Sequence, residues 1–123
     1  MAIQYVGGGT AYGNNGINVT ASLTALIGGI GTAPQAGDIV VVAVAHSANV
    51  NTNPGVSTAG YVELTDLYYS ATYHSNLSVN YKVMGATPDT TVVALGSGNT
   101  AHSTTVAVMV FRGVNTTNPI DTP

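Results

Sequence analysis

The segment IVVVAVA at residues 39–45 decides the fold class, because it is apolar at every position and rich in β-branched residues. A second segment of this kind, VAVMVF, occupies residues 106–111. A strand with one face in solvent alternates apolar and polar residues, whereas a strand that is apolar on both faces has a second layer or a partner subunit over its outer face. We therefore predict that residues 40–44 and 106–110 form central strands of an antiparallel β-sandwich.

The rest of the chain is read as further short strands separated by turns. Strands are predicted at residues 2–6, ended by the glycines at 7–9, and at 17–23, 61–69, 73–83 and 91–95. Helical periodicity is confined to residues 21–27, which Gly28 and Gly29 end. We predict one all-β domain over residues 1–123, an antiparallel sandwich of about seven to eight strands, either jelly-roll or immunoglobulin-like.

Residues 73–83 show the cleanest alternation in the chain. We predict that the set with Tyr73, Leu77, Val79 and Tyr81 faces the core. The opposite, polar face would then carry His74, Asn76, Ser78, Asn80 and Lys82.

Composition excludes several functional classes. Only 6% of the 123 residues are charged, the net charge is −3, and the two cations are Lys82 and Arg112. Nucleic-acid binding through phosphates and binding of a basic helix to a membrane surface both need clustered cations, so neither is predicted. No stretch reaches the roughly 18 apolar residues of a membrane-spanning helix. The absence of cysteine excludes disulfides and thiolate metal sites.

The N-terminal residues MAIQY show no secretory signal, although the Thr-, Asn- and Gly-rich composition is typical of proteins that work outside cells. Release by lysis, as part of a virus particle, accounts for both observations. The alternative is a secreted protein whose signal was removed and replaced by Met.

Three segments, in order, resemble a known family of β-sandwich modules: AGDIVVVA at 36–43, NYKV at 80–83 and FRGVNTTNPID at 111–121. Such modules occur in bacteriophage tail-fibre and other virion proteins, and in large bacterial surface proteins. The similarity covers residues 36–121. Ala59-Gly60-Tyr61 stands where the family usually has Ala-Gly-Trp. The family pattern continues beyond the last segment, so we expect an N-terminal part of a longer polypeptide, with a natural small protein as the alternative.

The resemblance implies a non-enzymatic structural component of a tailed-bacteriophage virion. Its place would be a tail fibre or appendage that mediates assembly or host attachment, and it would be made in the host cytoplasm without a signal peptide. Two alternatives stay open. One is a capsid decoration (cement) protein, and the other is a carbohydrate-binding adhesin module of a bacterial surface protein.

Four residues are the candidates for contact with a partner or ligand: Tyr68, Tyr69, His74 and Asn76. Alternation leaves Tyr68 or Tyr69 exposed, never both on one face. His46, His74 and His102 are spaced by 28 residues, but we interpret them as solvated or interface histidines rather than metal ligands, and no metal or cofactor is predicted.

Three charged side chains are considered for a catalytic or a stabilising role: Glu63, Asp66 and Arg112. Glu63 and Asp66 form the only close carboxylate pair, and they fall on opposite faces of a strand unless it breaks between them. We predict no catalytic role for them. Arg112 is predicted to form a structural salt bridge with Asp38 or Asp121.

Low surface charge predicts that the chain does not act as an isolated monomer. The uncharged strand at residues 91–95 is a candidate edge for pairing with another chain, and the outer faces of the doubly apolar strands need cover. The family resemblance implies a homotrimer. Other virion proteins are the alternative partners, and a host-surface glycan is a further candidate.

Overall fold

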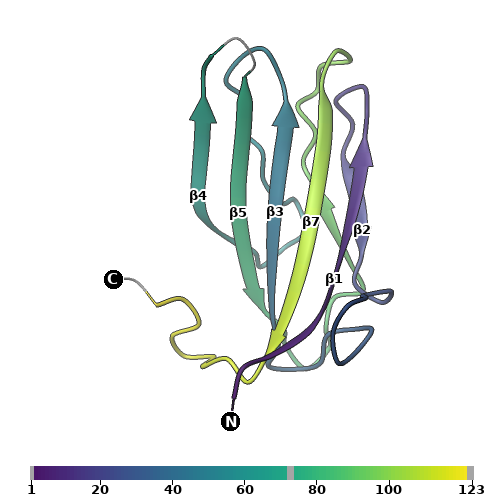
Figure 1. Ribbon diagram of the computed structural model, residues 1–123, viewed down its shortest axis with the longest axis vertical. Helices are drawn as coiled ribbons and strands as arrows, with labels where there is room; N and C mark the ends of the chain where they lie inside the picture. The colour runs from purple at the N-terminus through teal and green to yellow at the C-terminus, as the bar shows by residue number, and fades with distance from the viewer. Residues whose placement is uncertain (1, 72–73, 122–123) are drawn as a thin grey trace.

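The computed structural model describes residues 2–71 and 74–121, which form strands and loops without a helix. Seven antiparallel strands make two sheets, one of five strands in the order β1-β7-β3-β5-β4 and one of two strands, β2-β6 (Figure 1). Their bounds are β1 Gln4–Gly13, β2 Val19–Ser22, β3 Ile39–Ser47, β4 Val62–Tyr69, β5 Ser75–Val83, β6 Thr91–Ala94 and β7 Ser103–Arg112. The predicted all-β, sandwich-type fold is confirmed.

The two doubly apolar segments are central, as predicted. β3 is the middle strand of the large sheet and β7 is its neighbour. Their inner faces form the core. Val40, Val42 and Val44 of β3 are fully buried, and they pair with the buried Val110, Val108 and Val106 of β7. Leu23, Leu26 and the buried residues of β2 and β6 complete this core from the other side. Burial of apolar area on this scale is the main force that holds the two layers together.

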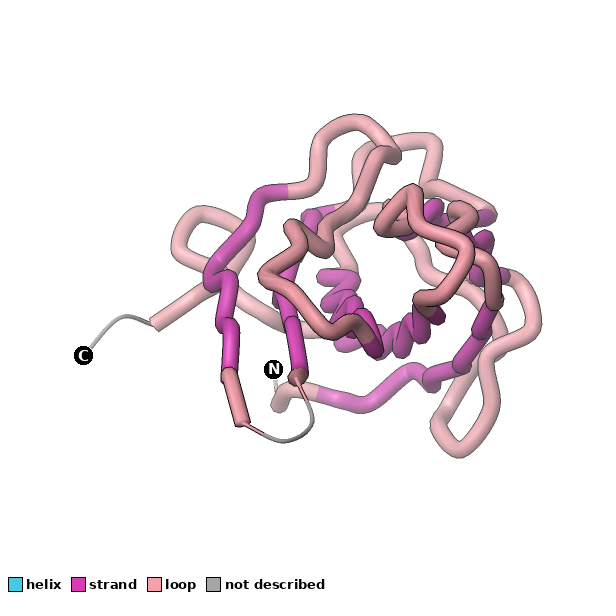
Figure 2. The backbone as a smooth tube through the Cα atoms, turned by 90° about the horizontal axis from the view of Figure 1, so that it is seen from above, coloured by secondary structure: helices cyan, strands magenta, loops and turns pink. Residues whose placement is uncertain are grey.

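Two different covers close the inner face of the large sheet. The β2-β6 sheet packs through β2 over β1 and β7, and the 48–60 segment lies alongside β6 and covers β5. Figure 2, a view along the strands, shows the strands and these loops enclosing the interior. Backbone hydrogen bonds from Ser57 to Val93 and from Leu95 to Gly55 occupy the outer edge of β6. The prediction that residues 91–95 offer a free edge is therefore wrong.

Strand β1 does not end at its glycines but continues through them to Gly13. The register shifts between Tyr5 and Gly7, a β-bulge, and the strand then pairs with β7 along its full length. A Cβ on Gly8 would lie 2.5 Å from the Tyr5 hydroxyl oxygen and 2.7 Å from the Val108 carbonyl oxygen. A side chain at Gly8 would thus collide with its neighbours, so the close packing at this position requires glycine despite its low strand preference. β2 is also shorter than predicted, since Ile17 precedes it and is 58% exposed.

Strand β5 faces the opposite way from its prediction. Asn76, Ser78 and Asn80 are 1%, 0% and 3% exposed and point between the layers, while Leu77 and Val79 lie on the outer face. The register with β3 fixes this orientation, because Ser78 pairs with the inward-facing Val44. The physical reason is the 48–60 cover, whose backbone needs hydrogen-bond partners from β5. Tyr73, placed in the same set as Leu77, lies outside the described residues.

Both described ends of the chain leave the fold at one pole. Gln4 at the start of β1 pairs with Arg112 at the end of β7, and Figure 1 shows β1 beginning and β7 ending at the bottom of the sheet. The end of β4 lies at the opposite pole. No helix of the described residues is long and apolar enough to cross a membrane.

Candidate functional site

The four predicted contact residues do not form one site. Tyr69 is 68% exposed and lies on the outer face of β4, whereas Tyr68 is 39% exposed and lies on the other face. The Tyr68 hydroxyl is 2.6 Å from His74 Nδ1, and the two rings stack with centroids 5.8 Å apart. This pair ties the end of β4 to the start of β5. Tyr68 and Tyr69 therefore occupy opposite faces, as strand alternation requires.

Asn76 is an internal anchor and offers no exposed surface. Its Oδ1 accepts a hydrogen bond from the Thr52 backbone N–H (2.8 Å), and its Nδ2 donates to the Val50 carbonyl (3.2 Å). His46 holds the same segment, with Nδ1 2.8 Å from Thr52 Oγ1 and Nε2 2.8 Å from the Leu95 carbonyl oxygen. Because a carbonyl only accepts, Nε2 carries the proton and Nδ1 accepts from the Thr52 hydroxyl. These contacts fix the loop that covers β5.

Two of the three histidines, His46 and His102, are buried and hydrogen-bond to loops. The prediction that the three histidines are solvated or interface residues is wrong for His46 and His102, which are 2% and 5% exposed. His102 is held by Ser97 Oγ (3.0 Å) and Asn49 Oδ1 (3.3 Å). Among the described residues, no group of three His, Asp or Glu side chains lies close enough to hold a metal ion.

Glu63 and Asp66 lie on the same side of β4. A bulge between Glu63 and Thr65 places Glu63 opposite Asn80 and Asp66 opposite Ser78, both inward-facing partners. The break in the strand that would bring the two carboxylates to one face is therefore present. Both residues remain exposed at the sheet edge, where carboxylates also discourage pairing with a foreign strand.

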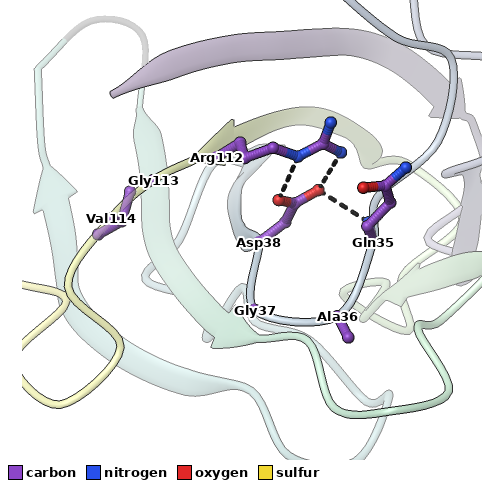
Figure 3. Close-up of a pocket in the computed structure, with 7 residues that line it drawn as sticks. All are labelled: Gln35, Ala36, Gly37, Asp38, Arg112, Gly113 and Val114. Carbon is purple, nitrogen blue, oxygen red and sulfur yellow. Dashed lines mark hydrogen bonds and ion pairs between the residues drawn. The ribbon is translucent and has the colours of Figure 1, made fainter. Parts of the chain in front are cut away.

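The predicted Arg112 salt bridge is formed with Asp38. Arg112 Nε and Nη2 donate to Asp38 Oδ1 and Oδ2 at 2.9 and 2.8 Å, and the Gln35 backbone N–H donates to Oδ2 at 2.7 Å (Figure 3). The Asp38 side chain is only 2% exposed, against 26% for Arg112. Hydrogen bonding to Asp38 raises the pKa of the Arg112 guanidinium. A bidentate pair of this kind is geometrically specific, and it joins the loop before β3 to the end of β7.

A shallow hollow of about 300 Å³ borders the Asp38–Arg112 pair, lined also by Gly37, Gly113 and Val114. All the carboxylate and guanidinium contacts in Figure 3 are made within the protein. The ion pair that borders the hollow is therefore a structural contact, and the Gln35 side chain also lines the hollow.

A second ion pair lies near the end of β5 and joins Lys82 to Asp89. Lys82 Nζ lies 2.7 Å from Asp89 Oδ2, donates to the Ala59 carbonyl at 3.0 Å and stands 5.5 Å from the centre of the Tyr61 ring. Burial and then the negative charge of Asp89 raise the pKa of Tyr61. The Tyr61 hydroxyl is buried and has no hydrogen-bond partner. The Lys82 and Arg112 charges are thus both committed to ion pairs.

The main exposed feature is the outer face of the five-stranded sheet. Paired residues form rows across it: Gly8, Met109, Val41, Tyr81 and Val62 in one row, and Thr10, Ala107, Ala43, Val79 and Thr65 in the next. A third row contains Tyr12, Thr105, Ala45, Leu77 and Leu67. None of these residues is charged. A contiguous apolar face without charges is typical of a protein interface.

In the first two rows this face is small at the β1–β7 side and bulky at the β4 side, while Tyr12 of the third row, on β1, is 78% exposed. At the β1–β7 side, Gly8, Gly9 and Ala107 leave a hollow of about 320 Å³ bordered by Tyr5 and Met109. At the β4 side, the side chains project into solvent, with Val62 51% and Leu67 55% exposed. Sequence reasoning identified the doubly apolar strands but missed this face as a whole, because it assigned Leu77, Val79 and Tyr81 to the core.

Comparison with protein-family models, with curated proteins and with solved structures finds no match to this chain.

Proposed function

We propose that this protein is a non-enzymatic structural component of a tailed-bacteriophage virion, a tail-fibre or appendage module that mediates assembly or host attachment. The observation that carries the proposal is the uncharged, apolar outer face of the five-stranded sheet. A protein that works alone in solution rarely presents such a surface, whereas a module of a larger assembly buries it against a neighbour.

The family-like segments add support from stability. Asp38 belongs to the AGD segment and Arg112 to the FRG segment, and their side chains form the bidentate pair. The most distinctive residues of the resemblance thus hold the scaffold together, which suits a structural module. The proposal assigns no catalytic residue, cofactor or metal.

The test is the presence and position of the chain in particles. Particles are purified from the phage whose genome carries the gene for this chain. Mass spectrometry of these particles should detect the chain at a fixed copy number. Immunogold labelling with an antibody against the purified chain should mark the tail. Labelling of the capsid surface would instead support a decoration protein. Absence from purified particles would refute the virion proposal.

An adhesin module is the second candidate, and exposed aromatic side chains favour it. Tyr69 at the end of β4 is 68% exposed, and rings of this kind stack on sugars. A glycan array with the wild-type chain and the Tyr69→Ala variant tests it. Tyr12→Ala is a matched control, since Tyr12 is 78% exposed on the opposite edge strand. Loss of binding with the Tyr69 variant alone supports the adhesin reading, and absence of any glycan signal contradicts it.

A further inference from the structure

We propose that the outer face of the five-stranded sheet binds the same face of a second copy, with a two-fold axis running along β3. This inference rests on the proposed assembly function and names the partner of that surface. Lack of charge is the first argument. A charged partner face would find no counter-charge among these rows, whereas an identical face is neutral and apolar.

The second argument is the size of the face. Five strands spaced by about 4.8 Å, each about nine residues long at about 3.3 Å per residue, span an area of roughly 700 Å². Two such faces together would bury roughly 1,400 Å², which lies within the range of stable, specific interfaces. The face is therefore large enough to hold a dimer by itself.

The third argument is complementary shape, which selects the direction of the axis. A two-fold axis parallel to β3 places β4 and β5 of one copy over β1 and β7 of the other. Within one row, the protruding Val62 and Tyr81 then oppose the Gly8 hollow and Met109 of the second copy. An axis across the strands would instead place β4 on β4, with the protruding Val62 of one copy against Leu67 of the other, and only Tyr12 would face the hollow.

The geometry makes a specific pairwise prediction. In the second row, Val79 of one copy opposes Ala107 of the other, and Ala43 opposes Ala43 at the axis. Sheets that pack face to face cross at about 30°, so residues close to the axis keep these partners, while the edge strands shift relative to one another.

Sedimentation equilibrium tests the pairing. The wild-type chain of 12.4 kDa should form a species of twice that mass. Val79→Glu and Ala107→Lys should each weaken the dimer about a hundredfold or more, because each buries an unpaired charge. An equimolar mixture of the two variants should restore the dimer, because each Glu then opposes a Lys. Thr20→Lys, on the exposed face of β2, is the matched control and should leave the dimer unchanged.

The outcomes separate this inference from the virion proposal. Circular dichroism should show that each variant keeps the β-spectrum, and restoration in the mixture is itself proof that both variants fold. A wild-type monomer at high concentration, a trimer such as the resemblance implies, or variants that do not rescue each other would overturn the two-fold pairing. Each of these leaves the virion proposal standing if particles contain the chain. A dimer formed by a chain absent from particles would refute the virion proposal and retain the pairing.

Discussion

Removal of the Arg112 side chain tests most directly whether the Asp38–Arg112 ion pair stabilises the fold. In Arg112→Ala, the Asp38 carboxylate stays almost fully buried and keeps only the hydrogen bond from the Gln35 backbone N–H. Loss of one partner of a buried pair costs about 3–5 kcal/mol. Because Arg112 is one-quarter exposed and water can enter the vacated space, we expect the lower end, about 3 kcal/mol. Arg112→Lys, which retains the charge but loses the two-pronged contact, should fall between Arg112→Ala and the wild type.

Asp89→Asn is the matched control for this experiment. It breaks the Lys82–Asp89 pair, whose side chains are 21% and 22% exposed, so its cost should be about 1 kcal/mol or less. Urea unfolding followed by circular dichroism, at dilutions where self-association does not contribute, measures both free energies of unfolding. Equal costs for Arg112→Ala and Asp89→Asn would refute the assignment of Asp38–Arg112 as the dominant ion pair.

Three further changes probe the interior. Tyr61→Phe removes a buried hydroxyl without a partner, so the free energy of unfolding at pH 7 should stay equal or rise. Folding raises the pKa of Tyr61, so the unfolded chain loses this proton at a lower pH than the folded one. The wild type should therefore lose stability relative to Tyr61→Phe as the pH rises past the ordinary tyrosine pKa of about 10. Unfolding curves recorded from neutral to alkaline pH measure this difference. Asn76→Leu strips the Thr52 backbone N–H of its partner, and should cost about 2 kcal/mol and speed hydrogen exchange at that amide. A Cβ on Gly96 would collide with the backbone of Gly16 and Ile17, so Gly96→Ala should lower the free energy of unfolding by about 1–3 kcal/mol. Gly85→Ala, with open space around it, should change this free energy by less than about 0.5 kcal/mol.

The parts of the fold that depend on local pattern were predictable. The apolar runs at 39–45 and 106–111 indicated central strands, and β3 and β7 occupy those places. The Arg112 salt bridge could be predicted because the chain has few charges and a cation at the end of an apolar strand needs a carboxylate partner.

The orientation of β5 could not be predicted, because it depends on what covers each face. Alternation shows that Leu77 and Val79 share a face with each other and not with Asn76, but it leaves open which face is internal. The choice is made by a loop 24 residues away in sequence, since the Thr52 amide takes its acceptor from Asn76. The outer face escaped prediction for the same reason. The β4 bulge likewise depends on pairing with β5, so the shared face of Glu63 and Asp66 was left conditional.

The position of the two chain ends has a practical consequence for any attempt to immobilise or label the protein. Since Gln4 pairs with Arg112, a tag, bead or surface joined to either end approaches the same pole. The end of β4 at Tyr69 then points away from the support (Figure 1), and the rows of the outer sheet face lie to one side of it. An array printed through either end would present this end of β4 to soluble ligands. Crowding on the same array would bring neighbouring molecules together side to side, at the faces through which pairing is proposed.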